Sequence, residues 1–395
     1  MKRNQTSDSS SPGANSQPLT ARGVERPHYQ SIALVVVLLG VMMTAIDTTA
    51  VVLALPVMTS DLHSDILTTV WVIISYLLVL TIFGTQVGRL GDMYGRVRMY
   101  NTGFAIFTIG SLLCGLGQNG VEVIAFRLIQ GLGGALVFSN SGAIIADTVP
   151  EARRGRAYGL TGIGYSIGAV LGILVGGAII TFVSWRFIFF INVPIGIAAV
   201  IIGYLVLKDR SPRVQMKIDT LGMGLLGSGL LLFLFALTEI TGTGLSIRSD
   251  LELLVGFLLM VGFVFWERSY SAPLLDMSMF RTRVFSASVF ASFFQGLSSF
   301  AVLFLVIMYL QGVRGLSPFA ASVLLIPGYI LGSVTGPLAG RASDKYGARV
   351  IASAGIALQA VGIVIYSTLD LNTALSIVVI GIDTKHFRVC SCTEQ

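Results

Sequence analysis

Long apolar stretches alternate with short polar ones along almost the whole chain. Most of these stretches are close to the roughly 20 residues that an α-helix needs to cross about 30 Å of hydrocarbon. The breaks fall at charged residues, prolines and Asn/Asp clusters, and they delimit eleven spans: residues 32–56, 69–88, 99–117, 121–146, 157–181, 188–207, 218–238, 251–267, 285–311, 319–339 and 350–369. A further apolar run starts at Thr373, but Asp383 and Lys385 stop it after about ten residues, which is too short to cross. The pattern predicts an all-α, polytopic membrane protein.

Composition agrees with this class and excludes a soluble domain. Of the 395 residues, 54% are hydrophobic and 12% are charged, whereas about 25% charged is usual in soluble domains. Residues 1–31 are polar and rich in Ser, Pro and Gly, so we expect a disordered tail without a cleavable signal peptide. Cys114 lies in a span, and Cys390 and Cys392 have no second pair, which predicts neither a metal site nor a structural disulfide.

The basic residues indicate the orientation in the membrane. Of the 26 Lys and Arg residues, 22 lie in the N-terminal tail, in every second loop and at the C-terminal end. The other loops hold only Arg186, Arg248 and Arg314, and Arg127 lies within a span. Because cytoplasmic loops carry an excess of Lys and Arg, we expect a multi-pass protein of the cell membrane with a cytoplasmic N-terminus. The net charge of +6 follows this pattern and forms no continuous basic stripe, so it indicates no nucleic-acid partner.

An internal repeat divides the chain. Residues 88–95, between spans 2 and 3, and residues 340–347, between spans 10 and 11, share the pattern G-R-x-x-D-x-Y-G and lie on the same side of the membrane. This sidedness indicates a parallel duplication. Eight spans separate the copies, whereas a duplicated six-span bundle would separate them by six. We therefore expect a six-helix bundle at 32–207, a two-helix insert at 208–268, an incomplete second bundle at 269–382 and an aberrant tail at 383–395.

These motifs resemble those of the major facilitator superfamily. Residues 88–96 match its G-x-x-x-D-x-x-G-R loop. The runs at 47–49 and 54–56, at 127–131, and at 185–186 and 192–196 resemble its fourteen-span drug:proton antiporter branch, as does the insert. The resemblance implies a major facilitator fold that works by alternating access. Two departures stand out: Ile173 occupies the place of an expected proline in span 5, and three further spans are missing, which indicates a truncated chain.

Two charged residues are candidates for proton coupling. No G-x-x-x-x-G-K-[ST] loop is present to bind a nucleotide, so an ion gradient is the expected energy source. Asp47 is the only acid well inside a predicted span, where a charge costs about 2.5–3.5 kcal/mol. At 1.5 Å per residue it lies about 13 Å below the outer face, and Arg127 lies about 9 Å below it. We hypothesise that both face the central cavity and that Asp47 carries the proton; the alternative is a static pair that fixes helix orientation.

The two copies of the repeated loop are candidate gates. Their Asp side chains can accept hydrogen bonds from Arg side chains or helix N-termini and so latch the two halves together in one state. By resemblance, Asp92 would latch to a second-half helix that the chain lacks, while Asp344 could reach the start of span 5. The alternative is that the basic residues only fix topology. The candidate gating residues are Gly88, Arg89, Asp92, Gly95, Arg96, Gly340, Arg341, Asp344 and Gly347.

Glycines repeat at four-residue spacing in two spans: Gly164, Gly168, Gly172 and Gly176 in span 5, and Gly328, Gly332, Gly336 and Gly340 in span 10. Small residues at this spacing let membrane helices approach closely. We expect these faces to cross between the halves and to form part of a rocking surface. The alternative is that each face packs within its own half.

Polar side chains in apolar spans are candidate substrate contacts, although each could instead form an interhelical hydrogen bond: Tyr76, Gln130, Asn140, Gln295, Tyr309, Gln311 and Tyr329. The leading functional prediction is proton-coupled export of lipophilic or cationic compounds, with the lipid bilayer, a small-molecule substrate and protons as partners and no cofactor. The alternatives are a metabolite carrier of the same superfamily and a non-transporting truncated membrane protein. No nucleophile, base and orienting group converge on a motif, which argues against an enzyme.

Overall fold

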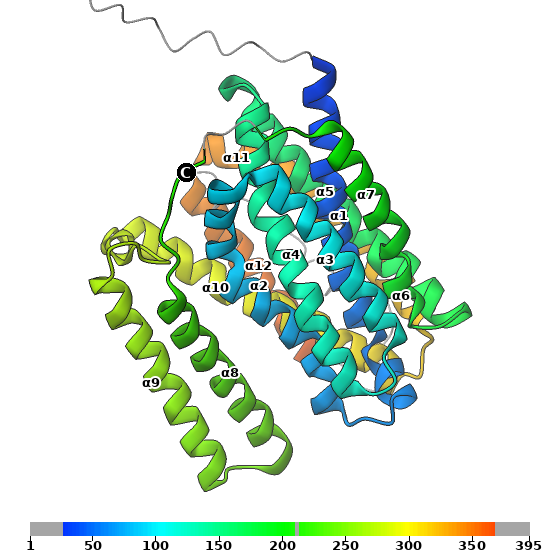
Figure 1. The fold of residues 1–395 in the computed structure, drawn as a ribbon. Coiled ribbons are helices and arrows are strands. Elements are labelled where there is room, and N and C mark those ends of the chain that lie inside the picture. Colours follow the sequence, from blue (N-terminus) through cyan, green and yellow to red (C-terminus); the bar gives the residue numbers. More distant parts are fainter. Residues whose placement is uncertain (1–26, 210–212, 368–395) are drawn as a thin grey trace, which may run out of the picture.

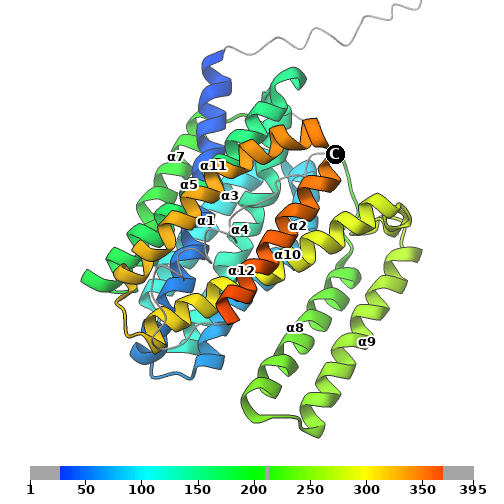
Figure 2. The same cartoon turned by 180° about the vertical axis from the view of Figure 1, so that it is seen from behind.

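The computed structural model describes residues 27–209 and 213–367, which form helices joined by short connections (Figures 1 and 2). The elements, in chain order, are α1 (Pro27–Asp61), α2 (Ile66–Tyr94), α3 (Arg96–Leu116), α4 (Gly120–Thr148), α5 (Glu151–Phe182), α6 (Phe187–Phe190), α7 (Asn192–Val206), α8 (Thr220–Thr243), α9 (Ile247–Ser269), the 3₁₀ turn η1 (Met277–Arg281), α10 (Arg283–Met308), the π turn η2 (Tyr309–Val313), α11 (Pro318–Tyr346) and α12 (Ala348–Ser367). The expected tails at 1–31 and 383–395 lie mostly or wholly outside these ranges.

Helix lengths match the predicted spans. Within the described ranges, ten helical segments are long and apolar enough to cross a membrane, with α6 and α7 together forming one of them. A shorter apolar segment, Pro318–Gly332, makes up the first half of α11. The all-α, polytopic class is therefore confirmed.

Both copies of the repeated loop form the same turn. α2 ends at Tyr94 and α3 starts at Arg96, while Gly95 between them has φ +110°. In the second copy α11 ends at Tyr346, and Gly347 has φ +88° before α12 begins. In each copy the glycine N–H donates to the carbonyl oxygen four residues earlier. Because a side chain is strained at such positive φ values, glycine is required at both turns.

The first bundle is built around α1 and α4. α1 packs against α5 and α4, while α4 packs against α3 and α2, and α7 covers α3. One hydrophobic cluster, which includes Val36, Tyr100 and Phe104, fills the end of this bundle where α1 begins. We call that end of the molecule, which carries the turn at Gly95 and the segments 207–209 and 213–219, the basic end, and the opposite end the far end.

The second bundle contacts the first mainly at the far end. A second hydrophobic cluster there joins residues of α1, α4 and α5 to Val306, Leu310 and Leu325 of the second bundle. Gln311 Nε2 donates to the Leu53 carbonyl oxygen at 3.0 Å, and the Phe319 N–H donates to Thr181 Oγ1 at 2.9 Å. Two of the three helices that follow the insert, α10 and α11, thus contact α1 and α5 directly (Figure 2).

The helices α8 and α9 form an antiparallel hairpin beside the bundles (Figure 1). Of the helices in the first bundle, α2 contacts this hairpin through α8. The Trp71 and Phe235 rings lie 5.9 Å apart, and a Cβ built at Gly227 would meet the end of Ile82 at 3.1 Å. The hairpin is therefore packed along the first bundle.

The glycine face of α5 packs differently from the prediction. A Cβ at Gly168 would lie 2.8 Å from the Met42 carbonyl oxygen, and one at Gly172 would lie 2.6 Å from that of Ile46, both on α1. Gly164 and Gly176 also face α1. The expectation that this face crosses between the halves is wrong. Glycines at four-residue spacing show that one side of a helix is smooth, but they do not show which neighbouring helix packs against that side.

α5 and α11 do pack together, as expected, but through another side of α5. A Cβ at Gly177 would lie 2.5 Å from Ser322 Oγ and 3.0 Å from the Pro318 carbonyl oxygen. Gly177 is turned by about 100° from Gly176 around the helix axis. On α11, Gly328 is buried and Gly332 is half-buried, while Gly336 and Gly340 fall where only the backbone is described. A rocking role for that face stays a prediction.

Candidate functional site: a buried ion pair in the first bundle

Asp47 and Arg127 meet inside the first bundle, although 80 residues separate them along the chain. Arg127 Nη1 donates to Asp47 Oδ2 at 2.6 Å, and each residue is only 1% exposed. Asp47 lies near the middle of α1 and Arg127 in the first third of α4. Because the two helices run in opposite directions, residues at similar distances from the far end come opposite one another.

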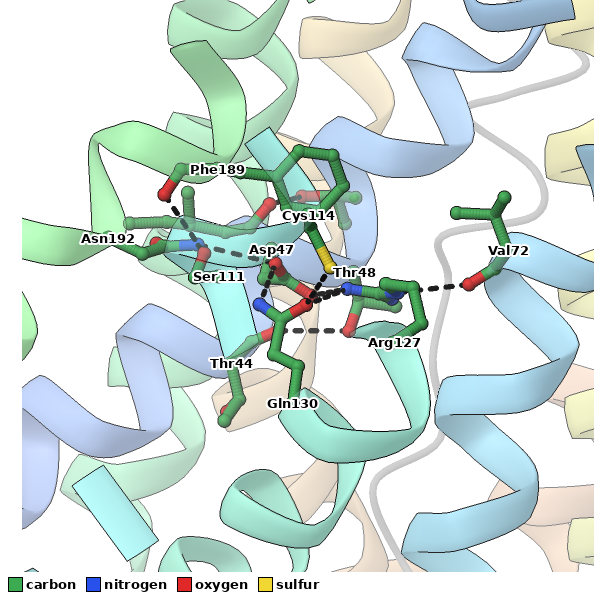
Figure 3. A network of polar contacts seen from close by, with 12 residues as sticks. Thr44, Asp47, Thr48, Val72, Ser111, Cys114, Arg127, Gln130, Phe189 and Asn192 are labelled. Atoms are coloured by element: carbon green, nitrogen blue, oxygen red, sulfur yellow. Dashed lines mark hydrogen bonds and ion pairs between the residues drawn. The ribbon is translucent and has the colours of Figure 1, made fainter. Parts of the chain in front are cut away.

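Three donors converge on the Asp47 carboxylate (Figure 3). Besides Arg127, Gln130 Nε2 donates to Oδ1 at 2.8 Å and Asn192 Nδ2 donates to Oδ1 at 3.3 Å. Asn192 Nδ2 also donates to Ser111 Oγ at 3.1 Å, and that hydroxyl donates to the Phe189 carbonyl oxygen. The carboxylate is thereby held by α1, α4 and α7, with α3 behind them.

The Arg127 guanidinium has partners on its other sides. Its Nε donates to the Val72 carbonyl oxygen at 2.9 Å and its Nη1 also donates to Gln130 Oε1 at 2.8 Å. The Tyr76 ring centroid lies 4.2 Å from the guanidinium carbon, a cation–π contact. Both charges are thus enclosed by protein, and the expectation that they face a central cavity is wrong for this conformation, because Tyr76 and the amide side chains cover them.

Such an arrangement stabilises two charges where each alone would be costly. An ionised group in a dry interior requires a partner and further hydrogen bonds to offset its lost hydration. Protonation of Asp47 would remove its charge and leave the Arg127 guanidinium without a counter-ion among the described residues around it.

The other candidate substrate contacts are not gathered in one place. Gln130 belongs to the ion-pair network, and Asn140 Nδ2 donates to its own helix at the Leu136 carbonyl oxygen. Tyr309 accepts from Arg314 Nη1 at 3.3 Å, and Gln311 bridges to α1. On α10, the carbonyl oxygen of half-buried Gln295 accepts from Gln359. A substrate role for these residues, and for Tyr329, stays a prediction.

Asp92 of the first copy of the repeated loop forms side-chain contacts within its own bundle, whereas Arg89 of that copy donates to main-chain carbonyl oxygens next to the α8–α9 hairpin. Asp92 pairs with Arg96 at 2.7 Å, and Arg96 also pairs with Asp147 on α4 at 2.7 Å. The resemblance implied a second-half partner for Asp92, whereas the structure shows a partner in its own loop. Its Gly88 has open space around a Cβ. In the second copy the side chains of Arg341 and Asp344 lie outside what the structure describes.

Residues that the sequence reasoning missed complete these sites. Asn192 and Ser111 join the ion-pair network. Asp209 caps the start of α3, since its carboxylate accepts from the Val97 and Arg98 N–H groups at 2.7 and 3.2 Å. A polar residue at the start of an apolar span marked Asn192, but no local pattern connects Asp209 with a helix more than 100 residues earlier.

Direct side-chain contacts of a Trp-Arg dipeptide hold the far end of the first bundle together. Trp185 Nε1 and Arg186 Nη1 both donate to Asp61 Oδ2, at 2.7 and 2.6 Å, and the guanidinium stacks on the Trp185 ring. The Trp-Arg dipeptide thus ties the start of α6 to the end of α1.

Comparison with known proteins agrees with the helical arrangement. The family model described as Major Facilitator Superfamily matches residues 37–384. The chain belongs to this superfamily. Its members are transporters rather than enzymes, and the chain accordingly has the fold of a multi-pass secondary transporter.

Several characterised superfamily members are similar in sequence. The riboflavin transporter RibZ of Clostridioides difficile is 31% identical over 88% of this chain and 76% of its own length. The tetracenomycin C resistance and export protein of Streptomyces glaucescens is 31% identical over 87% of this chain and 64% of its own length. The multidrug transporter protein MdtP of Bacillus subtilis is 29% identical over 85% and 62%, respectively. The chain therefore spans less than two thirds of the length of the last two relatives.

Solved structures of the superfamily share the fold at lower identity. A bacterial homologue of the human lysosomal transporter Spinster superimposes with a TM-score of 0.64 at 18% identity, covering 92% of this chain and 74% of its own. The xylose transporter XylE from E. coli gives a TM-score of 0.58 at 16% identity, with 92% and 82% covered. These likenesses support the architecture alone.

Proposed function

We propose that the chain serves proton-coupled export of lipophilic or cationic compounds by alternating access. The observation that carries the proposal is the enclosed Asp47–Arg127 pair, whose atoms lie 2.6 Å apart in the middle of an apolar bundle. Ionisable groups at membrane depth are costly, and they commonly mark ion pathways. Asp47 is the proton carrier in this scheme, and Arg127 stabilises its ionised form.

Proton binding would be linked to movement through the same contacts. Neutral Asp47 holds Arg127 less strongly. A proton on Oδ2 displaces the Arg127 hydrogen bond, and a proton on Oδ1 displaces a hydrogen bond from Gln130 or Asn192. α1 contacts α10 and α11 as well as α4 and α7. A change at Asp47 can therefore reach the contact between the bundles without an additional relay.

The contacts between the bundles support an alternating-access cycle. Within the described residues, the far-end cluster joins both bundles, whereas the basic-end cluster contains residues of the first bundle alone. With the basic end in the cytoplasm, as the positive-inside rule favours, this arrangement corresponds to a transporter closed toward the outside. Protonation and substrate binding would then open the contact between the bundles at the far end and close one at the basic end.

Sequence relatives favour drug-like substrates. One similar protein is named for tetracenomycin C resistance and export and another as a multidrug transporter. A metabolite carrier is the second candidate, because the riboflavin transporter is as similar as the exporters and Ile173 replaces the proline expected for antiporters. A static Asp47–Arg127 pair is the corresponding alternative for the site.

Transport into everted membrane vesicles separates these candidates. Vesicles that carry the wild-type chain, Asp47→Asn or the matched control Glu151→Gln are energised with an inwardly acidic pH gradient, and uptake of ethidium or of riboflavin is followed. We expect ethidium uptake that collapses with the gradient, is lost in Asp47→Asn and is kept in Glu151→Gln, whose side chain is exposed at the start of α5.

Other outcomes overturn parts of the proposal. Full gradient-driven uptake by Asp47→Asn would leave the pair as a static structural feature. Movement of riboflavin but not ethidium by the wild type would favour the metabolite carrier. Wild-type vesicles that move no compound, with the protein present and folded, would favour the non-transporting alternative.

A further inference from the structure

The two chain segments that connect the α8–α9 hairpin to the bundles meet at one arginine of the first bundle. Arg89, near the end of α2, donates from Nη1 to the carbonyl oxygens of Lys217 at 3.2 Å and Ala272 at 2.8 Å, and from Nη2 to that of Pro273. Lys217 precedes α8, and Ala272 and Pro273 follow α9. This junction therefore holds both ends of the hairpin against α2.

Two acidic side chains are buried next to this junction. Asp219, immediately before α8, is 1% exposed, and Glu267, near the end of α9, is 2% exposed. Asp219 accepts from the Gly222 N–H at 2.8 Å and from Trp266 Nε1 at 3.0 Å. The Glu267 Oε2 atom accepts from the Leu275 N–H at 3.0 Å, in the segment that leads to α10.

The two carboxyl groups face each other across Gly222. A Cβ built at Gly222 would lie 2.4 Å from Asp219 Oδ2 and 2.8 Å from Glu267 Oε1, so one oxygen of each carboxyl group adjoins the same point beside Gly222. Glu267 Oε1 is buried and receives no hydrogen bond from a donor among residues 27–209 and 213–367. Two ionised carboxylates in contact repel each other, and an unpaired buried acceptor is unfavourable.

No positive charge offsets both carboxylates. On the segments that connect the hairpin to the bundles, Arg213 and Asp276 are exposed. The charged and titratable groups nearer the junction along the chain are Arg89 of α2, Lys217 before α8, and Arg268 and Tyr270 at the end of α9. Arg89 is bonded to main-chain carbonyl oxygens, Tyr270 stacks on Trp266 with ring centroids 5.4 Å apart, and the other two side chains are exposed. Within the described part of the chain, neither acid forms an ion pair.

We propose that Asp219 and Glu267 form a proton-binding site. In this site Glu267 is protonated at Oε1, and its O–H group donates a hydrogen bond to Asp219 Oδ2. This proton satisfies the unpaired oxygen, leaves a single negative charge on the pair and supplies a further donor to Asp219. It links the start of α8, the end of α9 and the Leu275 segment, which Arg89 in turn holds on α2. Release of the proton to water places two negative charges in contact and loosens this junction.

This site is separate from the Asp47–Arg127 pair and does not depend on the proposed transport function. It lies at the basic end of the hairpin, whereas Asp47 lies in the middle of α1. Its ligand is a proton that comes from the solution at that end. The hairpin is thereby attached firmly to the first bundle at low pH and less firmly at high pH.

Thermal unfolding of the full chain in detergent between pH 6 and 9.5 tests the proposal. Glu267→Gln places an N–H where the proton is assigned, so its melting temperature should be insensitive to release of that proton. We expect the wild type to melt about 2–4 °C below Glu267→Gln at pH 9.5 and close to it at pH 6. The matched control Glu151→Gln, exposed at the same end of the molecule, should follow the wild type.

A second variant and a measurement on the wild type guard against a misfolded Glu267→Gln. Asp219→Asn keeps an acceptor for Gly222 and Trp266 while its amide donates to Glu267, so it should also lose the pH dependence. In the wild type, the fluorescence of Trp266, isolated by subtraction of Trp266→Phe, should change as the proton is released.

Three results would overturn the proposal. One is an identical dependence of melting temperature on pH in wild type and Glu267→Gln. Another is Trp266 fluorescence that stays constant over the whole range. The third is a melting temperature that rises with sodium relative to N-methylglucamine at constant pH and ionic strength, because the pair would then bind a metal cation rather than a proton.

Discussion

The contact between α1 and α5 leaves no room for a side chain at Gly172. In Gly172→Ala the new Cβ would lie 2.1 Å from Thr49 Oγ1, 2.6 Å from the Ile46 carbonyl oxygen and 2.8 Å from the Ile46 Cα. The Thr49 hydroxyl can rotate, at the loss of its 3.3 Å bond to the Ala169 carbonyl oxygen. The backbone of Ile46 cannot rotate away, so the two helices must separate.

The size of this separation sets the expected effect. Ordinary contact begins near 3.4 Å, so the carbonyl oxygen must move by about 0.8 Å, and a gap of this size forfeits about a quarter to a half of the dispersion energy of neighbouring contacts. Overpacking costs about 1–3 kcal/mol, whereas removal of a glycine from a helix gains at most about 1 kcal/mol. We therefore expect a net destabilisation of about 1–2 kcal/mol.

The assay is thermal unfolding in detergent beside a matched glycine. Gly162 lies on the same helix and has nothing within 4 Å of a built Cβ, so Gly162→Ala should leave the melting temperature unchanged or raise it. Gly172→Ala should lower it by about 2–8 °C. If Gly172→Ala melts as high as Gly162→Ala, the contact between α1 and α5 accommodates a methyl group at position 172, and the close packing inferred from the Cβ distances is wrong.

Three further outcomes follow from single contacts and are measured by the same unfolding assay. Asp47→Asn should destabilise the fold by about 3–5 kcal/mol because it leaves a buried guanidinium unpaired, and adding Arg127→Gln should recover part of the loss; strictly additive losses would contradict the pairing. Asp209→Ala should cost about 1 kcal/mol through loss of the cap on α3, and an unchanged melting temperature would show that the cap is dispensable. The Thr68 hydroxyl and N–H donate to the Asp65 carboxylate and hold its pKa below the ordinary value. The stability that depends on it is therefore present above that ordinary value and lost as the pH falls through the lowered pKa, so Asp65→Ala should melt lower than wild type at pH 7 and approach it as the pH falls below the ordinary value of 3.8; a constant difference would contradict this.

The helices could be predicted from sequence because the bilayer requires apolar segments of nearly constant length. Apolar runs about 20 residues long have few ways to satisfy their backbone groups other than a helix. The repeated loop was equally informative, since Gly95 and Gly347 occupy the same positive-φ position. The meeting of Asp47 and Arg127 followed from counting residues along two helices of known direction.

What sequence could not supply is the identity of neighbours. The glycine face of α5 was visible, but α1 and α11 were equally possible occupants, and the structure assigns it to α1. Likewise, the resemblance implies a distant partner for Asp92, whereas Arg96, four residues later and across the Gly95 turn, is within reach. Enclosure of the ion pair depends on Tyr76 and Asn192, which come from two other helices. Side-chain partners across helices depend on rotation about each helix axis, and hydrophobic runs in a membrane constrain that rotation weakly.

The residues of the Asp47 network are synthesised at different times. Asp47 is made 80 residues before Arg127 and 145 before Asn192, which at about 5–20 residues per second corresponds to about 4–16 s before the arginine exists. During that interval none of the three side chains that donate to the Asp47 carboxylate has been made. The ion pair can form only after α4 has been made, and the Asn192 contact is the last to be completed. The first bundle can therefore reach the arrangement seen around Asp47 only after its last helix, α7, has begun to be made.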